Sequence, residues 1–150
     1  MAVPDHVRRL RSAVGHDLLL LASITVLPTD DAGRVLLVRH ADTGVWGVIG
    51  GSVDVDESPA DAARRECVEE TGCEVELTGI LDALGGPEYR ITYPNGDRAA
   101  YVHVVYGARV VGGAPRPDGD ETTEVAWLDP ATAEVSDFAA ATLRAVGLRP

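Results

Sequence analysis

The stretch from Gly51 to Cys73 constrains this chain more than any other, because it contains a helix with clear signals at both ends. Ser58 is a favourable N-cap, and Pro59 suits the first helical position. Gly72 stands where a left-handed C-terminal cap favours glycine. These signals predict a helix that begins after Ser58 and ends before Gly72.

Three glutamates of this helix, Glu66, Glu69 and Glu70, are spaced to lie on one face. Clustered carboxylates repel one another, so a solvated acidic face is the simplest interpretation. The alternative is a site for hard divalent cations, which bind clustered carboxylate oxygens. The opposite face carries small or apolar residues that can be buried, namely Ala60, Ala63, Cys67 and Val68. The residues around the helix favour the cation site.

Glycine, glutamate and arginine recur around the helix at set intervals. Gly51 is followed after five residues by Glu57, and Glu57 after seven residues by Arg65, where the run RECVEETGC begins. This pattern resembles the Nudix box. It departs from that signature at packing and loop positions: cysteine replaces an aliphatic residue at Cys67 and Cys73, Ile49 replaces a frequent proline, and Asp56 replaces a common glycine.

The resemblance implies the Nudix fold, an α/β/α sandwich with a mixed β-sheet. It also implies Mg²⁺-dependent hydrolysis, with Mn²⁺ as a possible substitute, of the pyrophosphate linkage of ADP-ribose, a nucleotide sugar or a (d)NTP. Two alternatives stay open. One is a catalytically silent Nudix-like domain that binds a nucleotide or regulates, and the other is a protein-interaction module that uses the acidic helix face.

The resemblance also implies roles for single residues. Glu66, Glu69 and Glu70 are expected to bind the metal, with the Gly51 carbonyl as a further ligand, and Glu66 or Glu70 could also orient or deprotonate the attacking water. The expected structural residues of the box are Glu57, Arg65 and Gly72, with Glu57 paired to Arg65.

An acidic loop near residue 120 precedes the apolar run 125–128. It is either a solvated loop or, as in many Nudix proteins, the source of a further carboxylate. Glu121 is the leading candidate for that ligand or base, ahead of Asp120 and Glu124.

Substrate contacts are expected at two places outside the box. Arg39 and His40 end a predicted strand, where they either meet a substrate phosphate or form a solvated strand end. Tyr89 or Tyr93 could stack on a base, although packing within a hairpin explains either tyrosine equally well.

The rest of the chain predicts a mixed α/β sheet with helices on both faces. Residues 18–27 form an apolar run that predicts a buried strand, with 34–40 as its return strand in a hairpin. Asn95-Gly96 predicts a hairpin turn before the long apolar strand 98–111, in which His103 is expected to be a core or strand-face residue rather than a catalytic one. Residues 4–14 and 138–146 are predicted helices.

Length and composition predict a single domain over residues 1–150, with residues 1–16 as an N-terminal helical extension that leaves room for a homodimer. The net charge of −11 argues against binding nucleic acid polymers but not small phosphorylated molecules. The chain shows neither a signal peptide nor an apolar run of transmembrane length, so a cytoplasmic protein without membrane contact is expected. Its two cysteines form no CxxC motif, which makes a zinc site improbable.

Overall fold

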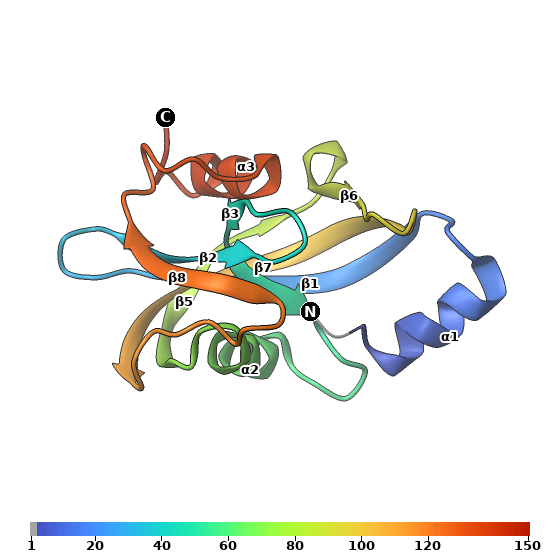
Figure 1. Ribbon diagram of the computed structural model, residues 1–150, viewed down its shortest axis with the longest axis horizontal. Coiled ribbons are helices and arrows are strands. Elements are labelled where there is room, and N and C mark those ends of the chain that lie inside the picture. Colours follow the sequence, from blue (N-terminus) through green and yellow to red (C-terminus); the bar gives the residue numbers. More distant parts are fainter. Residues whose placement is uncertain (1–2) are drawn as a thin grey trace.

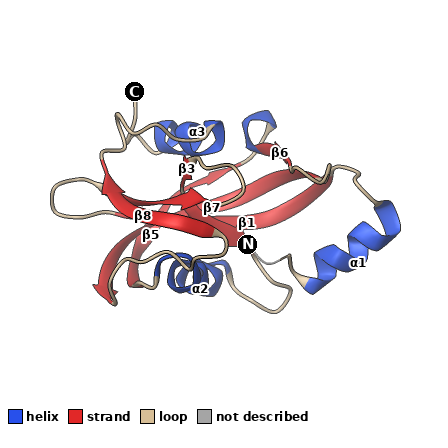
Figure 2. Cartoon of the chain, in the orientation of Figure 1, coloured by secondary structure: helices blue, strands red, loops and turns tan. Residues whose placement is uncertain are grey.

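In the computed structural model, which describes residues 3–150, β-sheets lie between α2 on one side and α3 on the other (Figures 1 and 2). The elements are α1 (Asp5–Val14), β1 (Leu19–Pro28), β2 (Val35–His40), β3 (Trp46–Gly47), β4 (Ile49–Ser52), α2 (Pro59–Thr71), β5 (Glu74–Leu84), the 3-10 turn η1 (Pro87–Tyr89), β6 (Arg90–Thr92), β7 (Arg98–Gly112), β8 (Thr122–Leu128) and α3 (Asp137–Ala145). This arrangement confirms the predicted mixed α/β fold.

The strands form two sheets. The larger has the order β4-β1-β7-β5, with β6 also paired to β7, and the smaller has the order β3-β2-β8. The β1–β7 pair is parallel and the other strand pairs are antiparallel, so the larger sheet is mixed. Strand β4 leads through a short loop into α2, which packs across one face of the larger sheet against β4, β1 and β5.

The predicted hairpin between residues 18–27 and 34–40 is wrong. β1 pairs with β4 and β7, whereas β2 lies in the other sheet between β3 and β8; the isolated bridge Thr29↔Val35 lies at the turn that connects the two strands. Both segments are buried over most of their length, so each needs a strand neighbour on both sides. A hairpin pairs each strand along one edge only, whereas strands from distant parts of the chain pair with both edges.

Several other predictions are confirmed. β6 and β7 form the hairpin around Asn95-Gly96, and His103 within β7 is fully buried. The predicted N-terminal and C-terminal helices are α1 and α3. The apolar and charged residues after α2 form one strand, β5, which bends through shifts in its register against β7. No helix within residues 3–150 is long and apolar enough to cross a membrane.

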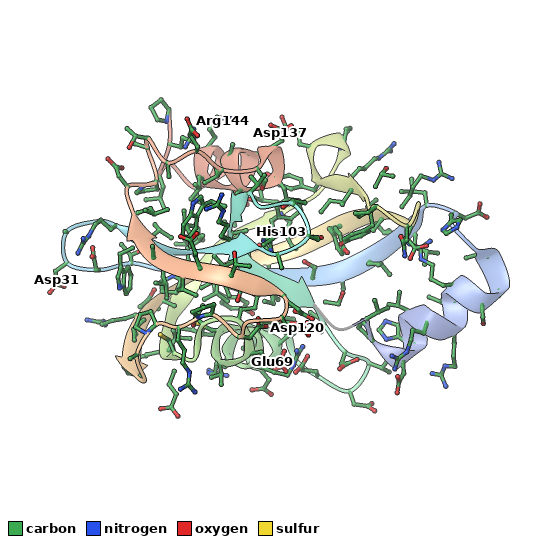
Figure 3. The ribbon with its side chains drawn as sticks, in the orientation of Figure 1. Asp31, Glu69, His103, Asp120, Asp137 and Arg144 are labelled. Atoms are coloured by element: carbon green, nitrogen blue, oxygen red, sulfur yellow. The ribbon has the colours of Figure 1, made fainter. Side chains whose placement is uncertain are left out.

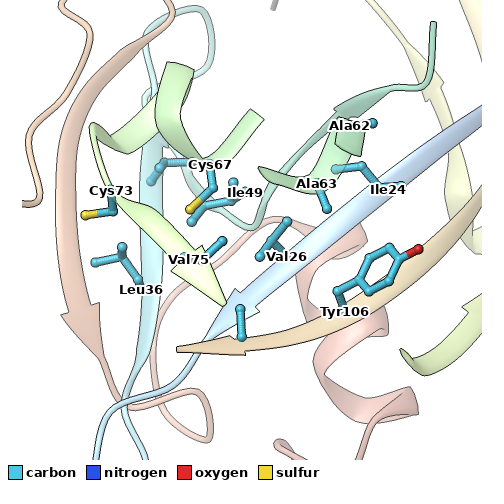
Figure 4. Close-up of a cluster of buried hydrophobic side chains, with 12 residues drawn as sticks. Ile24, Val26, Leu36, Ile49, Ala62, Ala63, Cys67, Cys73, Val75 and Tyr106 are labelled. Atoms are coloured by element: carbon cyan, nitrogen blue, oxygen red, sulfur yellow. The ribbon is translucent and has the colours of Figure 1, made fainter. Parts of the chain in front are cut away.

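One hydrophobic core lies between α2 and the two sheets (Figure 4). Ala63 and Cys67 of the helix pack there with Ile24 and Val26 of β1, and all four are fully or almost fully buried. Cys67 and the neighbouring Cys73 are free thiols that serve as small apolar side chains. This contact sets the rotation of α2 about its axis and therefore decides where its glutamates point.

Candidate active site

Helix α2 begins and ends as its sequence predicts. The Ser58 hydroxyl accepts a hydrogen bond from the Asp61 backbone N–H at 3.1 Å, and Pro59 occupies the first turn. Gly72 adopts the left-handed conformation with φ 73° and ψ 7°. Both ends are therefore stabilised locally, which makes the helix a firm support for the side chains along it.

The glutamate face of α2 is not uniformly solvated. Glu66 and Glu70 are each only 3% exposed, whereas the side chain of Glu69 is 55% exposed. Val68, predicted on the buried face, is 47% exposed. Figure 3 labels Glu69 on α2. The solvated-face interpretation is therefore wrong for Glu66 and Glu70, because the helix turns these two carboxylates toward the protein.

Strand β4 supplies a partner for Glu70. The backbone N–H of Gly50 donates to Glu70 Oε2 at 3.1 Å. A Cβ on Gly50 would lie 2.5 Å from the carbonyl oxygen of Ile24, so only glycine fits this close approach of β4 to β1. The next residue, Gly51, is buried and pairs with Ile24 in the sheet.

Arg65 joins the box loop to the helix. Its Nε and Nη2 donate to the two carboxylate oxygens of Glu57 at 2.7 and 2.8 Å, and Nη2 also donates to the Ser52 carbonyl at 3.1 Å. Its Nη1 lies 3.0 Å from Glu66 Oε1 and 3.2 Å from Glu69 Oε2. The paired donors of the guanidinium suit this two-oxygen contact, so Arg65 orients Glu57 and Glu66 together.

The loop before β8 brings Glu121 to the same region. The Glu121 carbonyl accepts a hydrogen bond from the Ala41 N–H at 2.8 Å, which attaches the loop to the end of β2. The negative charge of Glu121 contributes to raising the pKa values of both Glu66 and Glu70. Four of the predicted acidic residues, Glu66, Glu69, Glu70 and Glu121, thus gather around α2.

A family model described as the NUDIX domain matches residues 19–146. The chain belongs to the Nudix family. A MutT-like protein of Streptomyces ambofaciens is 36% identical over 108 residues, which are 72% of this chain and 63% of that protein. A putative 8-oxo-dGTP diphosphatase of Bacillus subtilis (strain 168) is 30% identical over 105 residues, or 70% of this chain and 64% of that protein. The matched part is therefore less than two thirds of either relative.

The Nudix fold is also seen in a solved relative. The crystal structure of a MutT NUDIX hydrolase from Burkholderia pseudomallei is 26% identical, with a TM-score of 0.70 over 85% of this chain and 98% of that one. The match covers far more of this chain than the box, so the likeness supports the fold as a whole.

The electrostatics of the Nudix helix favour a bound cation. Burial raises the pKa of Glu66 to about 7 against the attraction of Arg65, while Glu69 and Glu121 raise it further. Burial and the charge of Glu66 raise the pKa of Glu70 well above its usual value, although the Gly50 N–H opposes this. Two buried carboxylates near one cationic side chain are costly unless they bind a proton or a further cation.

This donor set suits a hard divalent ion in its chemistry, because every candidate side-chain ligand is a carboxylate. Within residues 3–150, however, no three acidic, histidine or cysteine side chains are already arranged as a group that could hold a metal ion. The described residues therefore provide oxygen donors but not a complete coordination shell.

The two residues predicted to meet a substrate phosphate, Arg39 and His40, have different surroundings in the structure. Arg39 points along the surface, where Nη1 donates to Glu124 Oε1 at 2.9 Å and Nε donates to the Gly44 carbonyl at 2.7 Å. His40 is half-buried and lies against Gly47, where a Cβ would be 2.7 Å from its Nε2. Burial lowers the pKa of His40, while the charges of Asp42 and Glu121 raise it. The charge of Glu121 thus reaches His40, whereas Arg39 is paired with Glu124.

Of the two interpretations of Tyr89, the structure supports packing within the protein rather than stacking on a substrate base. Tyr89 is 3% exposed, and its ring centre lies 4.7 Å from that of His103 and 5.2 Å from that of Phe138. The ring is thus enclosed by its own core. Tyr93 is also engaged within the protein, since its hydroxyl lies 2.5 Å from that of Tyr101.

Sequence reasoning misses two residues that shape the site, Asp118 and Thr122. The Thr122 hydroxyl lies 3.2 Å from the Glu70 carbonyl, and Asp118 Oδ1 accepts backbone hydrogen bonds from the turn that carries Glu121. The only local signal is the Asp-Gly dipeptide at 118–119, which is typical of turns in general.

Proposed function

We propose that this protein hydrolyses the pyrophosphate linkage of a nucleoside diphosphate derivative with the help of Mg²⁺. The observation that carries the proposal is the pair of buried carboxylates, Glu66 and Glu70, on the Nudix helix. The Bacillus subtilis relative is named as a putative diphosphatase, which agrees with a reaction at a phosphoanhydride. Nudix hydrolases generally use divalent metal ions, and the carboxylates around α2 match that need.

A phosphoanhydride resists attack because its negative oxygens repel a nucleophile. A bound divalent ion would neutralise those oxygens and lower the pKa of a coordinated water. The residues that would hold it are Glu66, Glu69 and Glu70, with the Gly51 carbonyl as an additional oxygen. Phosphoryl transfer requires mainly positioning and charge from the protein.

The chain's own residues then have separate tasks. The Gly50 N–H fixes Glu70 Oε2, so the carboxylate would meet a bound ion through its other oxygen, Oε1. Arg65 fixes Oε1 of Glu66 and keeps this buried carboxylate from turning away. Glu66, Glu70 or Glu121 would accept the proton of the attacking water, since burial and neighbouring negative charges make Glu66 and Glu70 stronger bases than an exposed glutamate.

The proposed substrate is a small nucleotide rather than a nucleic acid polymer, because the net charge of −11 opposes binding along a phosphate backbone. A (d)NTP is the first candidate, since a relative is named as a putative 8-oxo-dGTP diphosphatase. ADP-ribose and nucleotide sugars have the same diphosphate core and remain in the test.

The test is a chromatographic assay of the purified protein with (d)NTPs, 8-oxo-dGTP, ADP-ribose, nucleotide sugars and dinucleoside polyphosphates, in Mg²⁺ or EDTA. Glu70→Gln removes a charge from the site. Glu76→Gln makes the same chemical change on an exposed position of β5 and serves as the matched control. We expect cleavage in Mg²⁺ that disappears in EDTA and in Glu70→Gln but persists in Glu76→Gln.

Two results would contradict the proposal. Cleavage that is equal in Mg²⁺ and EDTA would exclude the role of the carboxylates as metal ligands. Stabilisation of the protein by one of these nucleotides in a thermal-shift assay, without any turnover, would instead support a silent nucleotide-binding domain.

A further inference from the structure

The loop between β7 and β8 is folded around one carboxylate oxygen. Asp118 Oδ1 accepts hydrogen bonds from the backbone N–H groups of Asp120, Glu121 and Thr122 at 2.9, 2.9 and 3.0 Å. The turn is closed by the Gly119 N–H, which donates to the Thr122 carbonyl at 3.1 Å. Charge-assisted bonds of this kind are about twice as strong as neutral ones, so Asp118 determines the shape of the turn.

The same turn is attached to the last turn of α2. The Thr122 hydroxyl lies 3.2 Å from the Glu70 carbonyl and 3.3 Å from Asp118 Oδ1, and it accepts a hydrogen bond from the Asp118 N–H at 3.2 Å. Further back in the loop, the Arg116 N–H donates to the Thr71 carbonyl at 2.8 Å. The loop is therefore connected to the backbone of the residue that carries one of the buried carboxylates.

We propose that Asp118 is a positioning residue that holds Glu121 beside the carboxylates of α2. The inference rests on the proposed function, in which Glu121 belongs to the active site. Asp118 acts through the backbone of the turn, because its Oδ1 accepts three N–H bonds from its own loop.

Loss of the Asp118 carboxylate should change the turn without unfolding the loop. The attachments on either side, from Arg116 to Thr71 and from Ala41 to the Glu121 carbonyl, do not involve the Asp118 side chain. Between them, the N–H groups of Asp120, Glu121 and Thr122 would lose their shared acceptor, so the turn would loosen and Glu121 would move relative to Glu66 and Glu70. A misplacement of about 1 Å in a reacting group can lower the rate about 100-fold.

The experiment compares Asp118→Ala, Asp118→Asn, Glu121→Gln and the double variant Asp118→Ala/Glu121→Gln. Asn keeps an oxygen that accepts the backbone bonds but lacks the charge of a metal ligand. The matched control is Asp129→Ala, because Asp129 Oδ1 accepts from the Ala131 N–H at 2.9 Å in a similar turn at the other end of β8. Measurements are kcat and KM for the substrate cleaved in the assay above, and amide hydrogen exchange of residues 119–122.

In Asp118→Ala, the amide hydrogens of Asp120, Glu121 and Thr122 should exchange with solvent about tenfold faster or more. This substitution should lower kcat by up to about 100-fold with little change in KM, and Asp118→Asn should recover most of the rate. In the Glu121→Gln background, Asp118→Ala should have almost no further effect on kcat, since both changes remove one function. Asp129→Ala should leave kcat and these amides unchanged.

Unchanged exchange of the three amides in Asp118→Ala would overturn the inference even if no substrate had been found. Effects of Asp118→Ala and Glu121→Gln on kcat that simply multiply would also overturn it. An Asp118→Asn variant as slow as Asp118→Ala would assign the carboxylate a direct charge role instead. Failure of the proposed function is distinct, because it appears as an inactive wild-type protein.

Discussion

Replacing Arg65 by alanine should be one of the most destabilising surface changes in this protein. Its guanidinium bonds to Glu57, Glu66, Glu69 and the Ser52 carbonyl, and the Arg65 side chain is 32% exposed. Glu66, in contrast, has a side-chain exposure of only 4%. Arg65→Ala would therefore leave a buried carboxylate without the cation that partly offsets its burial.

The size of the effect follows from this asymmetry. Breaking a buried ion pair by removing one partner costs about 3–5 kcal/mol, whereas an exposed pair contributes about 0–1 kcal/mol. Because Arg65 is partly exposed, we expect Arg65→Ala to lower the free energy of unfolding by about 3 kcal/mol. Glu57→Ala should cost about 1–2 kcal/mol, because Arg65 keeps Ser52 and Glu66 as partners, and it should retain some metal binding.

The assay is urea and thermal unfolding in EDTA at neutral pH. For a domain of this size, about 3 kcal/mol corresponds to a fall in Tm of roughly 6–12 °C. Arg64→Ala is the matched control, since the neighbouring Arg64 is 52% exposed and pairs only with the exposed Asp61 among the interactions of the described residues. Equal losses for Arg64→Ala and Arg65→Ala, or a larger loss for Glu57→Ala, would refute this reasoning.

Two further predictions concern the residues beside this pair. Gly50→Ala should lower the free energy of unfolding by about 2 kcal/mol or more and abolish turnover, because its Cβ would lie 2.5 Å from the Ile24 carbonyl oxygen. Gly85→Ala is the control and should be tolerated, because its Cβ would meet Val102 at 3.4 Å. Similar Tm values for the two variants would contradict this prediction. The folded-state pKa of Glu66, about 7, exceeds its ordinary value of 4.5, so the stability contributed by its proton is present below about pH 4.5 and is lost as the pH rises through 7. In EDTA, Glu66→Gln should therefore gain Tm relative to the wild type between pH 5 and 8, by an amount equivalent to up to about 3 kcal/mol, and a difference independent of pH would contradict this.

Local signals in the sequence were sufficient for the helix at the centre of the site. The N-cap at Ser58, the proline at 59 and the glycine at 72 act on their own neighbours, so they predict the same helix in any packed context. The spacing of Glu57 and Arg65 likewise predicted a pair that the structure contains. The hairpin around Asn95-Gly96 was predictable for the same reason, because its turn is determined by two adjacent residues.

Packing between distant segments decided the rest. Pairing of β1 with β7 joins residues that lie some eighty positions apart, and no local pattern distinguished it from a hairpin with β2. Helical periodicity placed three glutamates on one face, but the contact of Ala63 and Cys67 with β1 turned Glu66 and Glu70 inward and left Glu69 in solvent. The spacing of residues in the sequence determines which side chains share a helix face. Only the neighbours packed against that face determine whether water reaches it, and water access in turn sets the pKa values of the glutamates on which the chemistry depends.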